Sequence, residues 1–171
     1  MMIKEHKGYT LIELTVVIVL VGLLMTFTVP RVRESVSTDN LKASTRRIMS
    51  LIYSVRGDAI RDNRGYVLNF DKGSGRYWVE SPDMPELERS LARENADALP
   101  GDVRIMDITI VGDNSSQDGE TLIRFHNKGY VKPALIRLGS DKGKELTMIL
   151  RPFIRKIEVA EGRVEPEEVR F

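Results

Sequence analysis

The feature that most constrains this chain is an uncharged apolar run over residues 14–29, which reads LTVVIVLVGLLMTFTV. Extended back to Tyr9, the run covers 21 residues and is interrupted only by Glu13. As a helix, a segment of that length spans roughly 30 Å, the thickness of the hydrocarbon core of a bilayer. A helix buried in a soluble core would show a polar stripe, and this segment has none. The run therefore predicts a membrane-inserted helix.

The residues on either side of the run indicate its orientation. Lys4 and Lys7 precede it and favour a cytoplasmic N-terminus. Arg31 and Arg33 follow it, but a long domain after a span is translocated largely regardless of local charge. No A-x-A-like site follows the run, so an ordinary cleaved secretory signal is not expected. We therefore expect the rest of the chain outside the cytoplasm.

Glu13 is the anomaly within the apolar stretch. A carboxylate near the end of an apolar helix costs roughly a few kcal/mol unless it is neutralised or paired. One interpretation is that the side chain extends to the membrane interface. The other is that a cation from another chain, or a newly created amine, pairs with it. The second interpretation makes Glu13 a residue of subunit assembly and not a catalytic acid.

The hexapeptide GYTLIE at residues 8–13, together with the apolar run, resembles the class III signal of type IV pilins and type II secretion pseudopilins. The resemblance implies that a prepilin peptidase cuts between Gly8 and Tyr9 and methylates the new amino group of Tyr9, where phenylalanine is usual. It also implies that Glu13 pairs with the N-terminal amine of a neighbouring subunit. The segment before Tyr9 would leave, and the apolar helix would stay on the mature protein.

The same resemblance implies a pilin-like division of the chain and a bacterial inner-membrane location with the C-terminal domain in the periplasm. Gly22 and Pro30 lie where the family's helix has its glycine and its softening proline, so a kink is expected there. The expected parts are a cleaved leader at residues 1–8, a transmembrane and assembly helix at 9–30, an amphipathic second half of the helix at 31–64, and an antiparallel β domain at 65–171.

Beyond Pro30 the sequence becomes polar but keeps a helical period. Apolar residues recur at spacings of mostly three or four, which predicts one stripe that a folded domain covers. Asn63-Arg64-Gly65 then ends the pattern with residues typical of helix termination. The stripe consists of Val32, Val36, Leu41, Ile48, Leu51, Ile52, Val55 and Ala59.

From Gly65 onward the period changes to two, which is typical of strands. A long helix followed by about seven strands and a short surface helix within residues 85–98 predicts an α+β fold, with the helix packed against antiparallel sheet. Because neighbouring strand residues face opposite sides, Trp78 is expected in the core and Tyr77 toward solvent or a partner. The expected strands cover residues 66–70, 76–80, 103–111, 120–125, 131–138, 145–150 and 154–160.

The end of the helix refines the resemblance. Residues 51–80 are similar to the H-type minor pseudopilins of type II secretion (GspH) and to the FimT-like minor pilins, whose helix ends in an A-R-x-x-A-I-x-x-N-R-like motif. Val55 replaces the first alanine of that motif. The residues that match are Arg56, Ala59, Ile60, Asn63 and Arg64.

This similarity implies a minor pseudopilin, not an enzyme, that assembles into a periplasmic pseudopilus and drives protein export. The implied partners are prepilin peptidase, the major and minor pseudopilins of the same fibre, the inner-membrane assembly platform, and membrane lipid before assembly. Two alternatives remain open. One is a FimT-like minor pilin of a type IV pilus, and the other is a membrane-anchored periplasmic enzyme or sensor with a coincidental N-terminus.

Composition argues against several other chemistries. The chain has no cysteine and only two histidines, His6 and His126, so neither a disulfide framework nor a Cys/His metal site is expected. No Ser/His/Asp order, nucleophile elbow or P-loop occurs, so no catalytic residue and no cofactor is predicted. Residues 113–120 are rich in oxygen ligands but lack the alternating acids of an EF-hand loop. A plain loop is the preferred interpretation there, with calcium binding as the alternative. His126 is expected in a solvated turn.

Charge gives no indication of a nucleic-acid partner. The chain has 26 basic and 25 acidic side chains, and the expected leader removes Lys4, Lys7 and Glu5, which leaves 24 of each. The tail at residues 161–171 holds two arginines and four glutamates, so it is net negative. A protein that binds phosphates needs a basic footprint, so no nucleic acid is expected.

Overall fold

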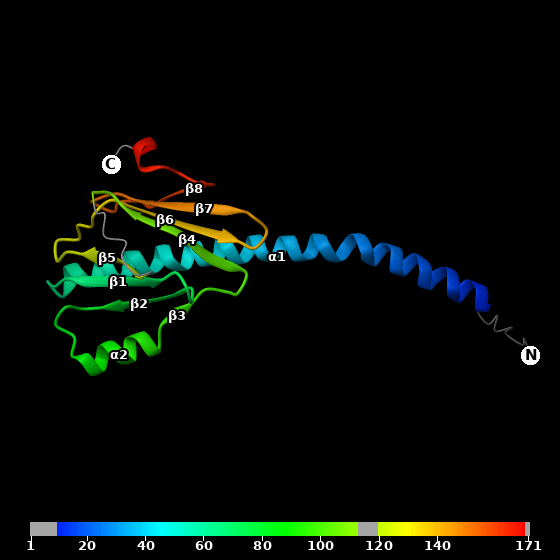
Figure 1. The fold of residues 1–171 in the computed structure, drawn as a ribbon, viewed down its shortest axis with the longest axis horizontal. Helices are drawn as coiled ribbons and strands as arrows, with labels where there is room; N and C mark the ends of the chain where they lie inside the picture. The colour runs from blue at the N-terminus through cyan, green and yellow to red at the C-terminus, as the bar shows by residue number, and fades with distance from the viewer. Residues whose placement is uncertain (1–9, 113–119, 170–171) are drawn as a thin grey trace, which may run out of the picture. The chain divides into compact units, whose positions relative to one another are not determined.

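The structure is a computed structural model that describes residues 10–112 and 120–169. The chain divides into two compact units, Met1–Val36 and Ser37–Phe171. Helix α1 (Leu11–Arg61) has 51 residues and contributes to both units. The second unit holds all the strands (Figure 1).

Both ends of α1 carry the residues that helix ends require. At the start, the hydroxyl oxygen of Thr10 accepts the backbone N–H of Glu13 at 3.3 Å, as an N-cap does. At the other end, Asn63 adopts a φ of 50°, the left-handed conformation that asparagine tolerates at helix C-termini. The N–H of Arg64 then donates to the carbonyl of Ala59 at 3.2 Å, which satisfies one of the terminal carbonyls. The helix therefore ends where the sequence predicts.

The strands form two antiparallel four-stranded sheets. The first has the order β3-β2-β1-β5, and helix α2 (Glu86–Glu94) lies in the connection from β2 to β3. The second has the order β4-β6-β7-β8 and is followed by a short 3-10 helix, η1 (Pro166–Glu168). The strands of the first sheet are β1 (Tyr66–Asp71), β2 (Arg76–Glu80), β3 (Asp97–Ala98) and β5 (Glu120–Phe125). Those of the second are β4 (Val103–Ile110), β6 (Ala134–Ser140), β7 (Glu145–Leu150) and β8 (Glu158–Glu161).

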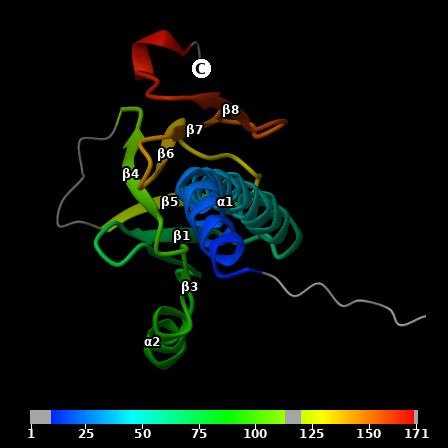
Figure 2. The ribbon, with the colours of Figure 1, turned by 90° about the vertical axis from the view of Figure 1, so that its right-hand side faces the viewer.

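Within Ser37–Phe171, the C-terminal part of α1 lies beside both sheets, as Figures 1 and 2 show. One core cluster joins buried side chains of α1 to those of both sheets. Burial of each large apolar side chain stabilises the fold by about 1.5–3 kcal/mol. The fold is α+β, with a helix packed against antiparallel sheets, as predicted. The α1 side chains in the core are Leu41, Ile48, Ile52, Val55 and Ala59.

The prediction for Tyr77 is wrong. Its side chain is 1% exposed and belongs to the core, while Trp78 on the opposite face is also buried, at 6%. Trp78 is buried because α2 covers that face, with the Arg93 guanidinium 5.2 Å from the centre of the indole ring. The expectation from alternation assumed that one face of the strand is exposed to solvent, whereas both faces of β2 are covered.

Two strands start at other residues than expected. Residue 131 was expected to begin a strand, but β6 begins at Ala134, directly after Pro133, which lacks an N–H for a ladder. Val131 instead forms an isolated bridge with Phe125. Residues 154–157 were also expected in a strand, yet the N–H of Ile157 donates to the Tyr53 hydroxyl at 2.8 Å, and β8 starts one residue later.

Candidate functional site

The described part of the first unit is dominated by exposed apolar side chains. Between Leu11 and Met25, every side chain of α1 is exposed on every side of the helix. The exposed fractions of the large apolar residues run from 44% at Val21 to 85% at Leu11. Exposed apolar surface on this scale marks a contact with a partner or a membrane. The residues are Leu11, Ile12, Leu14, Val16, Val17, Ile18, Val19, Leu20, Val21, Leu23, Leu24 and Met25.

Glu13 lies in the first turn of this surface helix. Its backbone N–H is held by Thr10, three residues earlier, and the Thr-x-x-Glu spacing is that of a capping box. A carboxylate in the first turn also complements the helix dipole, typically by about 0.3–1 kcal/mol. A glutamate at position 13 therefore also suits the start of the helix, which hydropathy alone does not indicate.

The other predicted residues of the N-terminal segment fall in different places. Gly8 and Tyr9 lie outside the described residues. Gly22 and Pro30 lie within α1, which is assigned as one continuous helix through both, and the kink stays a prediction. A Cβ added at Gly22 would meet no atom within 4 Å, so packing within this chain does not require a glycine there.

Across the described ranges, no helix combines the length and the apolar character that crossing a membrane requires.

The helix-end motif attaches α1 to the connection between β5 and β6. The Nε of Arg56 donates to the carbonyl oxygen of Gly129 at 3.1 Å. The side-chain oxygen of Asn63 accepts the amide of Asn127 at 3.1 Å. Ala59 is fully buried between these contacts, at 0% exposed. These residues therefore fix the end of the helix on the β domain.

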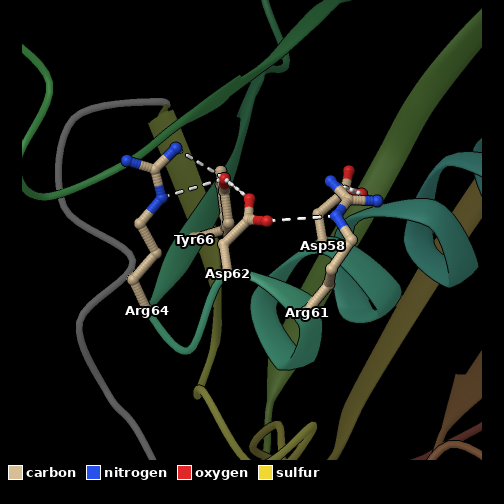
Figure 3. A network of polar contacts seen from close by, with 5 residues as sticks. All are labelled: Asp58, Arg61, Asp62, Arg64 and Tyr66. Carbon is tan, nitrogen blue, oxygen red and sulfur yellow. Dashed lines mark hydrogen bonds and ion pairs between the residues drawn. The ribbon is translucent and has the colours of Figure 1, made fainter.

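Arg64 belongs to a polar network that runs from the last turn of α1 to the first residue of β1 (Figure 3). Its Nη2 donates to the Tyr66 hydroxyl at 2.7 Å, and that hydroxyl donates to Asp62 at 2.6 Å. Asp62 also accepts Arg61 Nε at 3.1 Å, and Arg61 Nη2 pairs with Asp58 at 2.8 Å. The network thus links the last turn of α1 to the first residue of β1.

The network changes the acidity of its members. The hydrogen bond from the Tyr66 hydroxyl, with help from Arg61 and Arg64, lowers the pKa of the Asp62 carboxyl. The hydrogen bond to Asp62 in turn raises the pKa of the Arg61 guanidinium. Both groups are solvent-exposed, so the charges are screened and the network acts mainly on local geometry.

The remaining sequence candidates show no catalytic or metal-binding arrangement in the described residues. Over residues 10–112 and 120–169, no three His, Asp or Glu side chains come close enough to hold a metal ion. His126 is exposed in a turn, as predicted, with its ring 5.3 Å from that of Tyr130. The suggested calcium loop lies outside the described residues, apart from Glu120.

A helix that begins with exposed apolar residues and later packs against antiparallel sheets is the architecture of a pilin-like protein. The N-terminus agrees with this class. Residues 3–29 match the family described as the prokaryotic N-terminal methylation motif. That match includes Gly8, Tyr9 and Glu13.

Solved structures give a more particular likeness. The fold is similar to that of the minor pseudopilin EpsH from the Type 2 Secretion System of Vibrio cholerae, with a TM-score of 0.50 and 10% sequence identity. The alignment covers 71% of this chain and 97% of that one. A crystal structure of the same minor pseudopilin gives a TM-score of 0.49 at 14% identity, over 74% of this chain and 98% of that one. No curated protein sequence matches the chain.

These comparisons confirm the resemblance that the sequence predicted. The chain carries a type IV pilin-like methylation motif and shares its fold with an H-type minor pseudopilin. Neither match is to an enzyme, in agreement with the expectation of a structural subunit.

Proposed function

We propose that this chain is a minor pseudopilin of a type II protein secretion system, assembled through α1 into a periplasmic pseudopilus that drives protein export. One observation supports the proposal most strongly. The methylation motif at residues 3–29 overlaps the N-terminal part of α1, whose apolar side chains are exposed on every side from Leu11 to Met25, and the rest of the chain has the pilin-like fold. The helix would anchor the subunit in the inner membrane, with the β domain in the periplasm.

Processing supplies the charge that Glu13 needs. A cut between Gly8 and Tyr9 by prepilin peptidase creates an amine four positions before Glu13. An amine of a neighbouring subunit would then pair with the carboxylate in apolar surroundings, where an unpaired charge is strongly unfavourable. Subunits in the wrong register would leave Glu13 unpaired. Glu13 thus selects the register of assembly.

The apolar surface of α1 suits both environments that the proposal requires, the membrane before assembly and the helix bundle of the fibre after it. Exchange of lipid contacts for helix contacts is nearly neutral for apolar side chains, so extraction from the membrane needs external work. The inner-membrane platform and its motor would supply that work, and the major and minor pseudopilins of the fibre would supply the new contacts. Gly22 allows a neighbouring helix to approach closely, since a Cβ there would meet no atom of the described residues within 4 Å.

Mass spectrometry of the native protein tests the proposal. The expected N-terminus is Tyr9 with one added methyl group, and the Gly8→Val variant is expected to keep residues 1–8. Gly22→Val is the matched control, because it places the same side chain in the helix and leaves the cleavage site intact. A functional protein that retains residues 1–8 would contradict the proposal.

A deletion strain separates this function from that of a FimT-like minor pilin. Loss of protein secretion with normal twitching is expected for a pseudopilin. Loss of twitching with normal secretion would instead assign the chain to a type IV pilus.

A further inference from the structure

Helix α2 faces the opposite way to an ordinary surface helix. Leu87 and Leu91, one turn apart, are 72% and 47% exposed, and no residue of the helix is buried. Its arginines face the domain instead. Arg93 lies over the ring of Trp78, and Arg89 donates at 2.6 Å to a backbone carbonyl in the turn before α2. A surface helix normally buries its apolar face and exposes its charges. The leucine face of α2 (Leu87 and Leu91) is therefore free to pack against a partner.

Acidic side chains border the leucine face. At about 100° of rotation per residue, Glu94 lies within roughly 20° of Leu87, and Glu88 lies roughly 60° from Leu91. Both carboxylates are exposed. The two arginines lie on the opposite side and do not neutralise this border. The surface that fits the leucine face must therefore be apolar at its centre and basic at its edge.

The same chain presents such a surface at Phe153. The phenyl ring is 66% exposed and packs edge-on against Tyr130, with 5.9 Å between ring centres. The backbone around it is held in place. The carbonyl of Pro152 accepts the N–H of Val131 at 3.0 Å, and Ile154, next to Phe153, is 2% exposed. An aromatic side chain on a fixed segment loses little entropy on binding, which makes it a good anchor.

Basic residues flank Phe153 in the sequence. Arg155 and Lys156 follow Phe153 in the sequence and are both exposed. Arg151 precedes it and pairs with Glu158 at 3.3 Å, the one acidic residue among residues 151–158. We call Tyr130, Phe153, Arg155 and Lys156 the Phe153 platform. Its charge is opposite to that of the border of the leucine face.

We propose that two copies of this chain associate head to tail, with the leucine face of α2 in one copy packed on the Phe153 platform of the other. Glu88 and Glu94 lie against Arg155 and Lys156 across this contact. The two surfaces are different, so the contact is heterologous and the pair keeps one free leucine face and one free platform, on different copies, for further neighbours. This contact is separate from the assembly through α1.

Single-cysteine variants of the full-length protein test the contact, because the chain has no cysteine of its own. Ser90→Cys marks α2 and Arg151→Cys marks the platform, and both substitutions keep the proposed anchors. The two variants, purified in detergent with tags of different size, are mixed and treated with a short bismaleimide. We expect the mixed dimer to exceed either homodimer severalfold. Homodimers at an equal or greater yield, or no mixed dimer, would overturn the proposal.

Lys142→Cys is the matched control, because this exposed turn residue lies at the other end of β7 from the platform. It is expected to give only background cross-linking with Ser90→Cys.

Charge reversal gives a second, independent test. Glu88→Lys with Glu94→Lys on the Ser90→Cys chain is expected to lower the mixed dimer on the order of tenfold, because like charges would then face each other. Arg155→Glu with Lys156→Glu on the Arg151→Cys chain is expected to restore it. All four positions are exposed, so unchanged thermal unfolding confirms that each variant is folded. An unchanged yield after the first reversal, or no recovery after the second, would contradict the head-to-tail contact.

Discussion

Among single residues, Glu13 has one observed interaction and one that we propose. Its backbone N–H is capped by Thr10 within the same chain. Its carboxylate is proposed to pair with the amine of a neighbour. The first interaction needs only an ordinary helix start, whereas the second needs a negative charge. Substitutions that remove the cap and keep the charge, or remove the charge and keep the cap, therefore distinguish the two interactions.

Glu13→Gln and Glu13→Ala are both expected to abolish fibre assembly, because each removes the charge. Thr10→Ala is the matched control. It removes the cap, at a cost of about 1 kcal/mol, and keeps the charge, so assembly is expected to continue. Secretion by complemented deletion strains measures the outcome. Normal secretion with Glu13→Gln would show that the negative charge is not needed, and normal secretion with Glu13→Ala would favour an anchored enzyme or sensor.

Asp62 gives a prediction about pH. Its pKa is lowered in the folded chain, chiefly by the Tyr66 hydroxyl, so its contribution to stability is present above its unfolded pKa. That contribution is lost as the pH falls through the folded pKa. Tyr66→Phe removes the hydrogen bond and is expected to raise the pKa of Asp62 toward the usual value for an aspartate, as followed by NMR titration. Asp71, whose pKa is lowered chiefly by the Ser74 hydroxyl, is expected to be unaffected and serves as the control.

At the scale of elements, the contact between the end of α1 and the β5–β6 connection depends on Gly129. Its φ is 72°, and a Cβ there would lie 2.7 Å from Cδ1 of Ile60 and 3.1 Å from Nε of Arg56. Gly143 has a φ of 75°, yet a Cβ there would meet nothing within 4 Å. The two glycines therefore share the backbone strain and differ in the helix contact.

Gly143→Ala is expected to cost about 1 kcal/mol of unfolding free energy, from the left-handed backbone alone. Gly129→Ala is expected to cost about 2–4 kcal/mol, because overpacking against Ile60 adds to that strain. Denaturant unfolding measures both values. Ile60→Val in the Gly129→Ala background should recover part of the loss, and equal costs for the two glycines would contradict the importance of the contact.

Local patterns predicted most elements because their signals lie in neighbouring residues. The strands β2, β5 and β7 have the expected bounds, since alternation and turns mark them. The two-residue β3 was missed, because Asp97 and Ala98 carry no apolar alternation and pair only through β2. The division into two sheets was also not predicted, since pairs such as Tyr66 with Phe125 join residues far apart in the sequence.

The candidate site shows the same limit. Glu13 and the helix-end motif were found because their spacing is local. Phe153 and the leucine face of α2 were missed because only the tertiary structure shows which side of each segment is covered. Tyr77 was misplaced for the same reason, since α2 covers the second face of β2.

At the scale of the whole molecule, one core connects the two sheets through α1. Ile48, at 0% exposed, belongs to a cluster that includes Phe70 of β1 and Ile136 of β6. The sheets have no ladder in common. Their stability is therefore expected to depend jointly on the buried side of the helix.

Ile48→Ala is expected to lower the unfolding free energy by about 2–5 kcal/mol and to destabilise both sheets together. Fluorescence of Trp78, the single tryptophan, reports the first sheet, and amide hydrogen exchange in β6 and β7 reports the second. The denaturant midpoints of unfolding that the two probes report should shift by the same amount. Ile60→Ala, at a helix position that is 45% exposed, should shift both much less. Separate midpoints would show that the sheets unfold independently.

The outward-facing leucines of α2 also mean that this helix can open without disrupting the core. It contributes no side chain to the core, so its transient unfolding leaves both sheets intact and costs far less than global unfolding. A protease such as trypsin would reach Arg89 and Arg93 during these openings and cut there. A second copy bound to the leucine face would slow the cut. The rate of proteolysis between β2 and β3 would therefore report whether a subunit is bound to another copy or free.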